Sequence, residues 1–401
     1  MGIILTAGIS LAFLLIAFCL YKWGNLRCIG VTPVHTFTFI AILFTSGLDV
    51  GLIMFPLTEF AGYADLAASP EYAFSNPLAI EFAFWGFLIW GFYFLTSFYF
   101  CVIEPRVKFF EITPVKIINN IVIIGTCAFT AFLFLINLPW YVPQIGDGES
   151  VVATFYLIVF AVIFAAAYSS TDIKYVKILS LASTWLFIGL IALMWANASI
   201  GLGEFGAMMG LTGNYFTNMH KFVLPLNDYH EFYLFWWFAW SIMIGQFTSR
   251  FVGGLRTYQV FFALLILPSI PLAIWFAVLY YYHVNSIDIS GFYSIAMVVV
   301  GVTFVINSLD SLIRLYSDNL NVTVDTLGKW TYILVNVSAL FGLTLLFKLD
   351  FLEIQWIGAL VIGLYFACVI YIIVKKRKEV MSIDASPEGR TADFHKIETI
   401  H

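Results

Sequence analysis

FYLFWWFAWSIMIGQF, residues 232–247, contains no charged side chain. A helix rises about 1.5 Å per residue, so an apolar run of about 20 residues can cross roughly 30 Å of hydrocarbon. The rest of the chain has the same character: of its 401 residues, 62% are hydrophobic and 11% are charged, against about 25% charged residues in soluble domains. The sequence therefore predicts an all-α polytopic membrane protein and excludes a water-soluble enzyme.

Uncharged apolar runs recur along the whole chain, separated by Gly, Pro or charged residues, and each is long enough for one membrane helix. The sequence predicts about 11 transmembrane helices, at residues 3–22, 35–58, 78–103, 114–138, 149–169, 177–200, 229–250, 257–283, 289–313, 328–347 and 353–374.

The basic residues fall mostly on one side of this layout. Of the 19 lysines and arginines, only Lys221 and Lys348 fall outside the C-terminal tail and the loops after the first, third, fifth, seventh and ninth helices. Because cytoplasmic loops carry the excess of Lys and Arg, we expect an outside N-terminus and a cytoplasmic C-terminus in a bacterial-type plasma (inner) membrane. The net charge of −5 offers no basic face to nucleic acid.

The predicted helices also suggest how the chain is organised. Helices 2 to 6 and 7 to 11 would form two five-helix halves of opposite orientation, as is common in secondary transporters. The expected segments are an N-terminal helix and cytoplasmic loop at 1–34, a first repeat at 35–200, a periplasmic surface helix and loop at 201–228, a second repeat at 229–374 and a cytoplasmic tail at 375–401.

The second predicted helix carries an acidic residue at mid-depth, Asp49, between Gly47 and Gly51 and ahead of Pro56. Such a helix is expected to break. A carboxylate in hydrocarbon costs roughly 3 kcal/mol or more, so Asp49 is expected to face a polar cavity, a cation or a proton pathway, with a structural hydrogen bond as the alternative. Glu59, at the outer end of the same helix, is expected to be a solvated end cap, with a role in the site as the alternative.

Two predicted helices carry tryptophan-rich faces. Trp90 and Trp240 lie about 18 Å and 16 Å into their helices, too deep for the aromatic belt at the headgroups. At about 100° per residue each aromatic set falls on one side of its helix, so the two faces can converge. A quaternary ammonium has no N–H to donate, and aromatic faces attract it by about 0.5 to 2 kcal/mol per ring. The predicted cage comprises Trp85, Trp90, Tyr93, Trp236, Trp237 and Trp240, with ordinary packing as the alternative.

A polar cluster, TFVINSLDS at residues 303–311, lies deep in the ninth predicted helix. Small oxygen-bearing side chains beside a broken helix suit a dehydrated Na+, and hydrogen-bonded helix packing is the alternative. No cofactor, metal-ligand spacing or nucleophilic triad is evident among the six histidines and five cysteines, so an enzyme is not expected.

The stretch from Phe232 to Thr257, FYLFWWFAWSIMIGQFTSRFVGGLRT, resembles the helix signature of the betaine/choline/carnitine transporter family: WWxxWS, then G-x-F, an arginine and G-x-R-T. SGLDVGLIMFPLTEF, residues 46–60, is similar to the family's glycine-rich broken helix that ends in a glutamate. FWGFLIW, residues 84–90, resembles its next helix.

This resemblance implies a LeuT-like inverted repeat of 5+5 helices, often assembled as a homotrimer through the surface helix. It implies an aromatic box of Trp85, Trp90, Tyr93 and Trp237, flanked by Trp236 and Trp240, with Phe247 along the inner exit path. It also implies a sodium site formed by the backbone carbonyls of Thr45, Leu48 and Phe304 and the side chains of Asn307 and Ser308.

The chain departs from the family pattern at several positions. It begins at what resembles the family's second helix, so we expect a short variant that lacks the family's first helix. Asn307 stands where sodium-coupled members usually have a hydroxyl, and Asp49 replaces a glycine. Asp49 could bind the substrate's cation, carry a coupling proton or reinforce a cation site.

We therefore expect a secondary active transporter that imports a small quaternary-ammonium or betaine-type solute, such as choline, glycine betaine or carnitine, by alternating access. Asp49 favours a cation over a zwitterion, because a second carboxylate would be repelled at short range. Sodium coupling is favoured over proton coupling or exchange. The alternative is a transport-fold sensor or partner subunit that binds the solute without carrying it.

Overall fold

The computed structural model of the chain describes residues 1–36, 38, 39, 51–383 and 391–393. Within these residues eight helices are long and apolar enough to cross a membrane, which confirms the predicted all-α polytopic class; the count of eleven stays a prediction. The α-helices are α1 Gly2–Trp23, α3 Gly51–Ala64, α4 Pro77–Trp85, α5 Trp90–Phe98, α6 Glu104–Val107, α7 Thr113–Tyr141, α8 Ala153–Ser169, α9 Ile173–Asn197, α10 Leu202–Asn218, α11 Asp228–Ser249, α12 Thr257–Ile266, α13 Ser269–Val284, α14 Phe292–Leu320, α15 Val324–Leu327, α16 Lys329–Lys348, α17 Ile354–Tyr371 and α18 Arg377–Met381.

Short elements complete the chain. They are the strands β1 Arg27–Ile29, β2 Gly253–Arg256 and β3 Thr391–Asp393, the 3-10 turns η1 Pro70–Tyr72, η2 Phe87–Ile89 and η4 Met219–Phe222, and the π-helical turns η3 Tyr99–Ile103 and η5 Ile372–Lys376.

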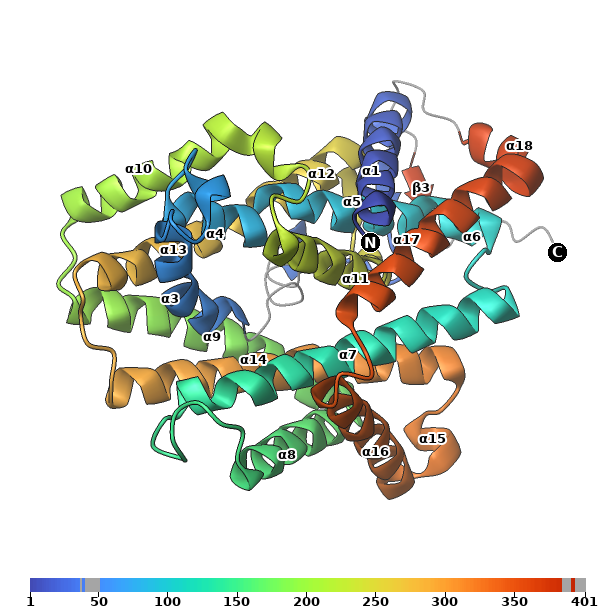
Figure 1. The fold of residues 1–401 in the computed structure, drawn as a ribbon. Coiled ribbons are helices and arrows are strands. Elements are labelled where there is room, and N and C mark those ends of the chain that lie inside the picture. The colour runs from blue at the N-terminus through green and yellow to red at the C-terminus, as the bar shows by residue number, and fades with distance from the viewer. Residues whose placement is uncertain (37, 40–50, 384–390, 394–401) are drawn as a thin grey trace.

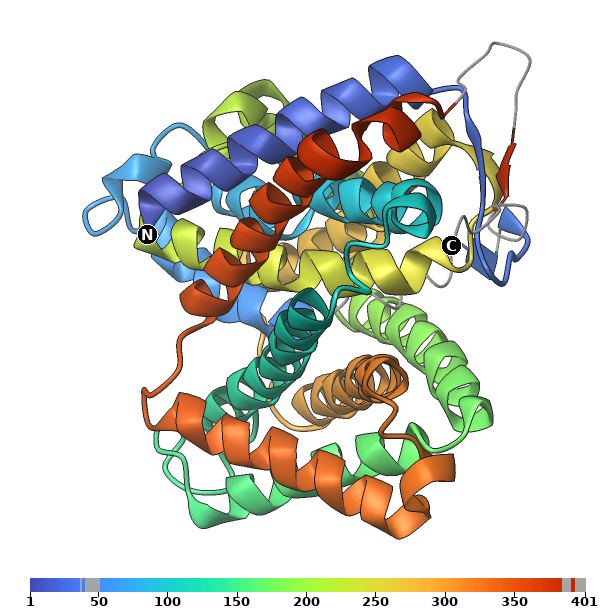
Figure 2. The ribbon, with the colours of Figure 1, turned by 90° about the vertical axis from the view of Figure 1, so that its right-hand side faces the viewer.

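The long helices form two groups (Figures 1 and 2). In one group α11 packs against α5 and α17, α1 packs against the same two helices, and α4 packs against α3, α10 and α13. In the other, α14 packs against α7 and α8, and α16 packs against the same two helices. α9 lies along α14, while α7 also contacts α11 and α17 and so joins the groups.

The predicted helix over 78–103 lies within one candidate membrane span, Pro77–Val107, but its α-helix is interrupted, stopping at Trp85 and resuming at Trp90. Gly86 is extended, with φ −116° and ψ 170°, and Phe87 has φ +50°. A non-glycine residue at positive φ is strained and persists only where its surroundings impose it. Here they do: the backbone N–H of Phe87 donates to Ser269 Oγ at 2.8 Å.

The predicted helix 257–283 is also divided, into α12 and α13, with Leu267 and Pro268 between them. In contrast, α3 continues past its internal proline, Pro56. Proline has no N–H to donate to the carbonyl four residues earlier. The indole N–H of Trp275 on α13 donates to that carbonyl, Leu52 O, at 3.0 Å, so a neighbouring helix satisfies the group that the proline leaves unpaired.

A small sheet gathers three of the segments predicted on the cytoplasmic side. β1 follows α1, pairs antiparallel with β2 after α11, and pairs parallel with β3 in the tail; its register sets Arg27 opposite Arg256. These three segments therefore lie at one end of the molecule. Their assignment to the cytoplasm rests on the charge distribution alone.

Candidate functional site

Three buried tryptophans meet at the centre of the first helix group. Trp85, the last residue of α4, lies edge-on to both tryptophans of α11, with ring centroids 5.1 Å from Trp237 and 5.6 Å from Trp236. The two α11 rings stack on each other at 5.0 Å with planes 12° apart. Each is at most 2% exposed. The two aromatic faces thus converge inside the bundle rather than pointing into lipid.

The other predicted cage residues lie further along the same elements. Trp90 begins α5, beyond the break, and packs edge-on against Tyr93 at 5.1 Å. Trp240 is 3% exposed, one turn beyond Trp236 on α11. Phe247 is half-buried near the end of α11 and contacts Phe251. Because the helix is interrupted at Gly86, counting 100° per residue from Trp85 to Trp90 does not give their relative directions.

The break between α4 and α5 is held by tryptophan side chains of the predicted cage. Helix termination leaves carbonyl oxygens near its end without backbone donors. The Trp237 indole N–H donates to Phe84 O at 2.7 Å, and the Trp90 indole N–H donates to Trp85 O at 3.2 Å. By contrast, the indole N–H groups of Trp236 and Trp240 are buried without an acceptor among the described residues.

The start of α3 touches this cluster directly. A Cβ added at Gly51 would lie 2.8 Å from the ring of Trp85, closer than carbon atoms approach one another. Phe55, one turn later, lies edge-on to the same ring at 6.3 Å. The residues before Gly51 include Asp49, Thr45 and Leu48, and these three predicted site residues lie outside the described part of the chain.

A group of buried hydroxyls surrounds Glu59. Tyr63 donates to its Oε2 at 2.8 Å, Tyr233 donates to its Oε1 at 2.8 Å, and Tyr229 also donates to Oε1. Glu59 is only 9% exposed. The expectation of a solvated end cap is therefore wrong: α11 supplies two of the three donors and encloses the carboxylate.

A second acid, Glu81, lies beside this group and was missed by the sequence reasoning. It is fully buried in the first turns of α4, and neither of its carboxylate oxygens accepts a hydrogen bond from any described residue. Its polar neighbours are Glu59, Tyr63 and the indole of Trp85. An ionisable residue inside a predicted span, as Glu81 is within 78–103, is itself a signal of function.

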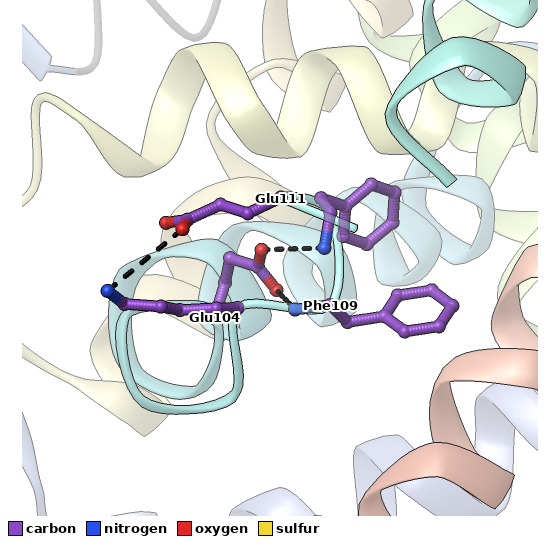
Figure 3. Close-up of polar contacts among 5 residues, drawn as sticks. Glu104, Phe109 and Glu111 are labelled. Atoms are coloured by element: carbon purple, nitrogen blue, oxygen red, sulfur yellow. Dashed lines mark hydrogen bonds and ion pairs between the residues drawn. The ribbon is translucent and has the colours of Figure 1, made fainter. Parts of the chain in front are cut away.

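Glu104, one residue past the other end of the same predicted span, is a partly buried acid whose carboxylate has a structural role. Its carboxylate turns back toward the chain (Figure 3): Oε1 accepts the N–H of Phe110 at 2.8 Å and Oε2 accepts the N–H of Phe109 at 3.1 Å. Tyr99 donates to Oε2 as well, at 2.5 Å. Glu104 therefore closes the turn after α6, and its hydrogen-bonding capacity is used there.

The outer surroundings of the acid pair link η1 to the start of α11. Asn227 donates to the hydroxyl of Tyr72 at 2.8 Å and also to Glu71. Burial raises the pKa of Tyr72 to about 12, so its hydroxyl stays protonated. His230 stacks on Phe84 at 4.5 Å, and its Nδ1 accepts the N–H of Leu226. The acid pair thus lies near the end of the bundle opposite the small sheet.

The residues predicted for sodium are partly engaged in helix packing. Ser180 on α9 donates to Asn307 Oδ1 at 2.8 Å, while Ser169 on α8 donates to Asp310 Oδ2 at 2.5 Å. Phe304 packs edge-on against Phe187, and Ser308 is buried. Because α14 is continuous over Phe292–Leu320, its carbonyls pair within the helix. The described residues thus offer no freed carbonyl here, and the sodium site stays a prediction.

A cavity of about 460 Å³ lies away from the three tryptophans. Its walls come from α1, α5, α11 and α17, and from both π-helical turns, η3 and η5. The lining is almost wholly apolar, with Arg377 among the lining residues.

Comparison with known proteins gives two distant relatives. No protein-family model matches the chain. The chain is 25% identical to an uncharacterized transporter of Haemophilus influenzae over 316 residues, an alignment that covers 69% of the chain. It is 23% identical to a glycine betaine transporter of Acinetobacter baylyi over 309 residues, an alignment that covers 65% of the chain. Each match covers 46% of the relative, so the chain spans about half the length of the curated relatives it matches. Both agree with the resemblance to the betaine/choline/carnitine transporter family.

Proposed function

We propose that the chain carries a small quaternary-ammonium or betaine-type solute across the membrane by alternating access. The observation that carries the proposal is the buried contact of Trp85 with Trp236 and Trp237. Indole faces are the protein surface that best attracts a methylated ammonium, at about 0.5 to 2 kcal/mol per ring. Two relatives named as transporters, one of them for glycine betaine, support it.

A solute can enter this cluster only if the rings separate. Centroid distances of 5.0 to 5.6 Å leave the three indoles in contact with one another. The backbone is interrupted at Gly86, immediately after Trp85, so α4 is not continuous with α5. We infer that α4 moves relative to α11 when the solute binds, and that Gly86 and Phe87 take up the change in backbone angles. Such short irregular segments are typical hinges.

The helix packing supports the further proposal of two inverted five-helix halves with a LeuT-like arrangement. The third and fourth helices of the first predicted half are α7 and α8, and those of the second half are α14 and α16. These four pack together as one group. An internal repeat would give this packing, because the third and fourth helices of one half would then occupy positions equivalent to those of the other half. Homotrimer formation through α10 and coupling to Na+ or H+ belong to the same proposal.

Uptake into proteoliposomes tests the function. Radiolabelled choline and glycine betaine are offered with imposed Na+ or proton gradients, and we expect saturable, gradient-driven accumulation of one of them. Trp237→Ala should weaken solute binding tenfold or more. Trp185→Ala is the matched control, because Trp185 is 65% exposed on α9. Equal loss in both variants would refute the cage, and binding without accumulation would favour a sensor or partner subunit.

A further inference from the structure

We propose that Glu59 and Glu81 together hold one exchangeable proton, and that a cation bound against Trp85 displaces it. The site is formed by residues of α3, α4 and α11. The proposal that the two acids bind a proton is based on their geometry. The proposal that a cation displaces this proton rests on the proposed function.

The two acids have opposite surroundings. Glu59 accepts hydrogen bonds from Tyr63, Tyr229 and Tyr233. Three hydroxyl donors stabilise a carboxylate, because hydrogen bonding to the charged form favours it. No described residue donates a hydrogen bond of ordinary length and angle to Glu81, which is fully buried beside Glu59, with Tyr63 and the Trp85 indole as its other polar neighbours. Two ionised carboxylates at short range in a low dielectric repel strongly, so Glu59 takes the negative charge and Glu81 takes the proton.

Among the described residues, the helices packed against α4, which are α3, α10, α11 and α13, supply no Lys or Arg to neutralise the pair. On α10, Tyr215 contacts Phe82, and on α13, Tyr280 and His283 contact Phe60 of α3 rather than the acids. The titratable groups near Glu81 are Glu59 and Tyr63 on α3, Glu71 and Tyr72 on η1, and Tyr229, His230 and Tyr233 on α11. A bound cation is therefore the partner that can replace the proton.

Glu81 and Trp85 are four residues apart on α4 and lie on the same face, one above the other. A quaternary ammonium on the Trp85 ring thus lies about one turn from the Glu81 carboxyl. Its charge stabilises ionised Glu81 by direct attraction. The Glu81 O–H bond then breaks, the electron pair stays on the carboxylate, and the proton leaves to the aqueous phase. One positive charge enters and one leaves, so the charge of the site is unchanged.

A zwitterion behaves differently from a cation at such a site. Choline brings one net positive charge, whereas the carboxylate of glycine betaine cancels its ammonium. Proton displacement is therefore expected for choline and much less for glycine betaine.

The test measures binding and proton release separately in purified, full-length protein. A thermal shift with choline reports binding and so tests the proposed function. A pH indicator in weakly buffered solution reports up to about one proton released per bound choline, and choline affinity should rise by up to about tenfold per pH unit while Glu81 is protonated. Glu81→Gln should abolish release and flatten the pH dependence. Glu104→Gln, at a partly buried acid whose hydrogen bonds are used locally, should leave both unchanged.

A ligand-independent measurement keeps the proton site testable if choline does not bind. The infrared C=O stretch of a protonated carboxylic acid should be present in the unliganded protein, with a component that Glu81→Gln removes and Glu104→Gln retains. Choline binding without proton release at any pH would overturn the coupling and leave the transport proposal standing. The absence of an infrared acid band that depends on Glu81 would overturn the proposal that the two acids share a proton. If Glu81→Gln does not fold, a choline affinity that is independent of pH in the unmodified chain would overturn it as well.

Discussion

Comparing the two neighbouring tryptophans of α11 isolates the contribution of one hydrogen bond to the stability of the protein. Trp236 and Trp237 are both buried and stack on each other. Trp237 donates to Phe84 O at 2.7 Å, whereas the N–H of Trp236 has no acceptor among the described residues. Replacing either by Phe removes a similar volume, but only Trp237→Phe leaves a buried carbonyl at the break unpaired. An unsatisfied buried group costs about 1 to 3 kcal/mol.

We therefore expect Trp237→Phe to lower the free energy of unfolding by about 1 to 3 kcal/mol more than Trp236→Phe does. The measurement is denaturant unfolding of both variants in the same detergent, followed by tryptophan fluorescence and circular dichroism. The double variant shows whether the two effects add, since stacked residues are expected to couple. Equal destabilisation by the two single changes would refute the idea that the Trp237 N–H supports the interruption at Gly86.

Two glycine substitutions test close helix approaches against one control. Gly51→Ala should weaken solute binding by about tenfold, because its Cβ would lie 2.8 Å from the Trp85 ring and displace it; ligand-induced thermal shifts measure this, and an unchanged affinity would contradict it. Gly245→Ala should destabilise the protein by about 1 to 3 kcal/mol or more, because its Cβ would lie 2.4 Å from the Thr96 side chain on α5; unfolding in denaturant measures this, and native-like stability would contradict it. Gly62→Ala, on α3 with no described atom within 4 Å of the added Cβ, is the control for both.

The sequence predicts the positions of the helices well, because hydropathy and flanking charge are properties of many residues taken together. The predicted spans in the described part of the chain lie mostly in helix, with interruptions in 78–103 and 257–283, because apolar length and flanking charge do not depend on details of packing. The meeting of Trp85 with Trp236 and Trp237 is predicted for the same reason. Aromatic residues placed deep in two spans are expected to pack against each other inside the bundle.

The interruption at Gly86 is not predictable in the same way. The sequence around it is as apolar as the rest of the span, and glycines also occur inside continuous membrane helices. What decides the break is tertiary: Ser269 and Tyr215 accept the N–H groups of Phe87 and Leu88, and Trp237 donates to a carbonyl on the other side. No local pattern shows that three distant segments supply these partners.

The acid pair was missed because Glu59 was interpreted from its own position and Glu81 was given no role. Glu59 looks like a solvated end of its helix, and Glu81 looks like the polar start of the next one. Only the packing of α3 against α4, with α11 across both, encloses them together. Because Glu81 and Trp85 belong to the same short helix, any movement of α4 that opens the tryptophan cluster also changes the distance between Glu81 and Glu59. Solute binding and proton binding are then linked by one rigid segment, and shortening or lengthening α4 should uncouple them without removing either group.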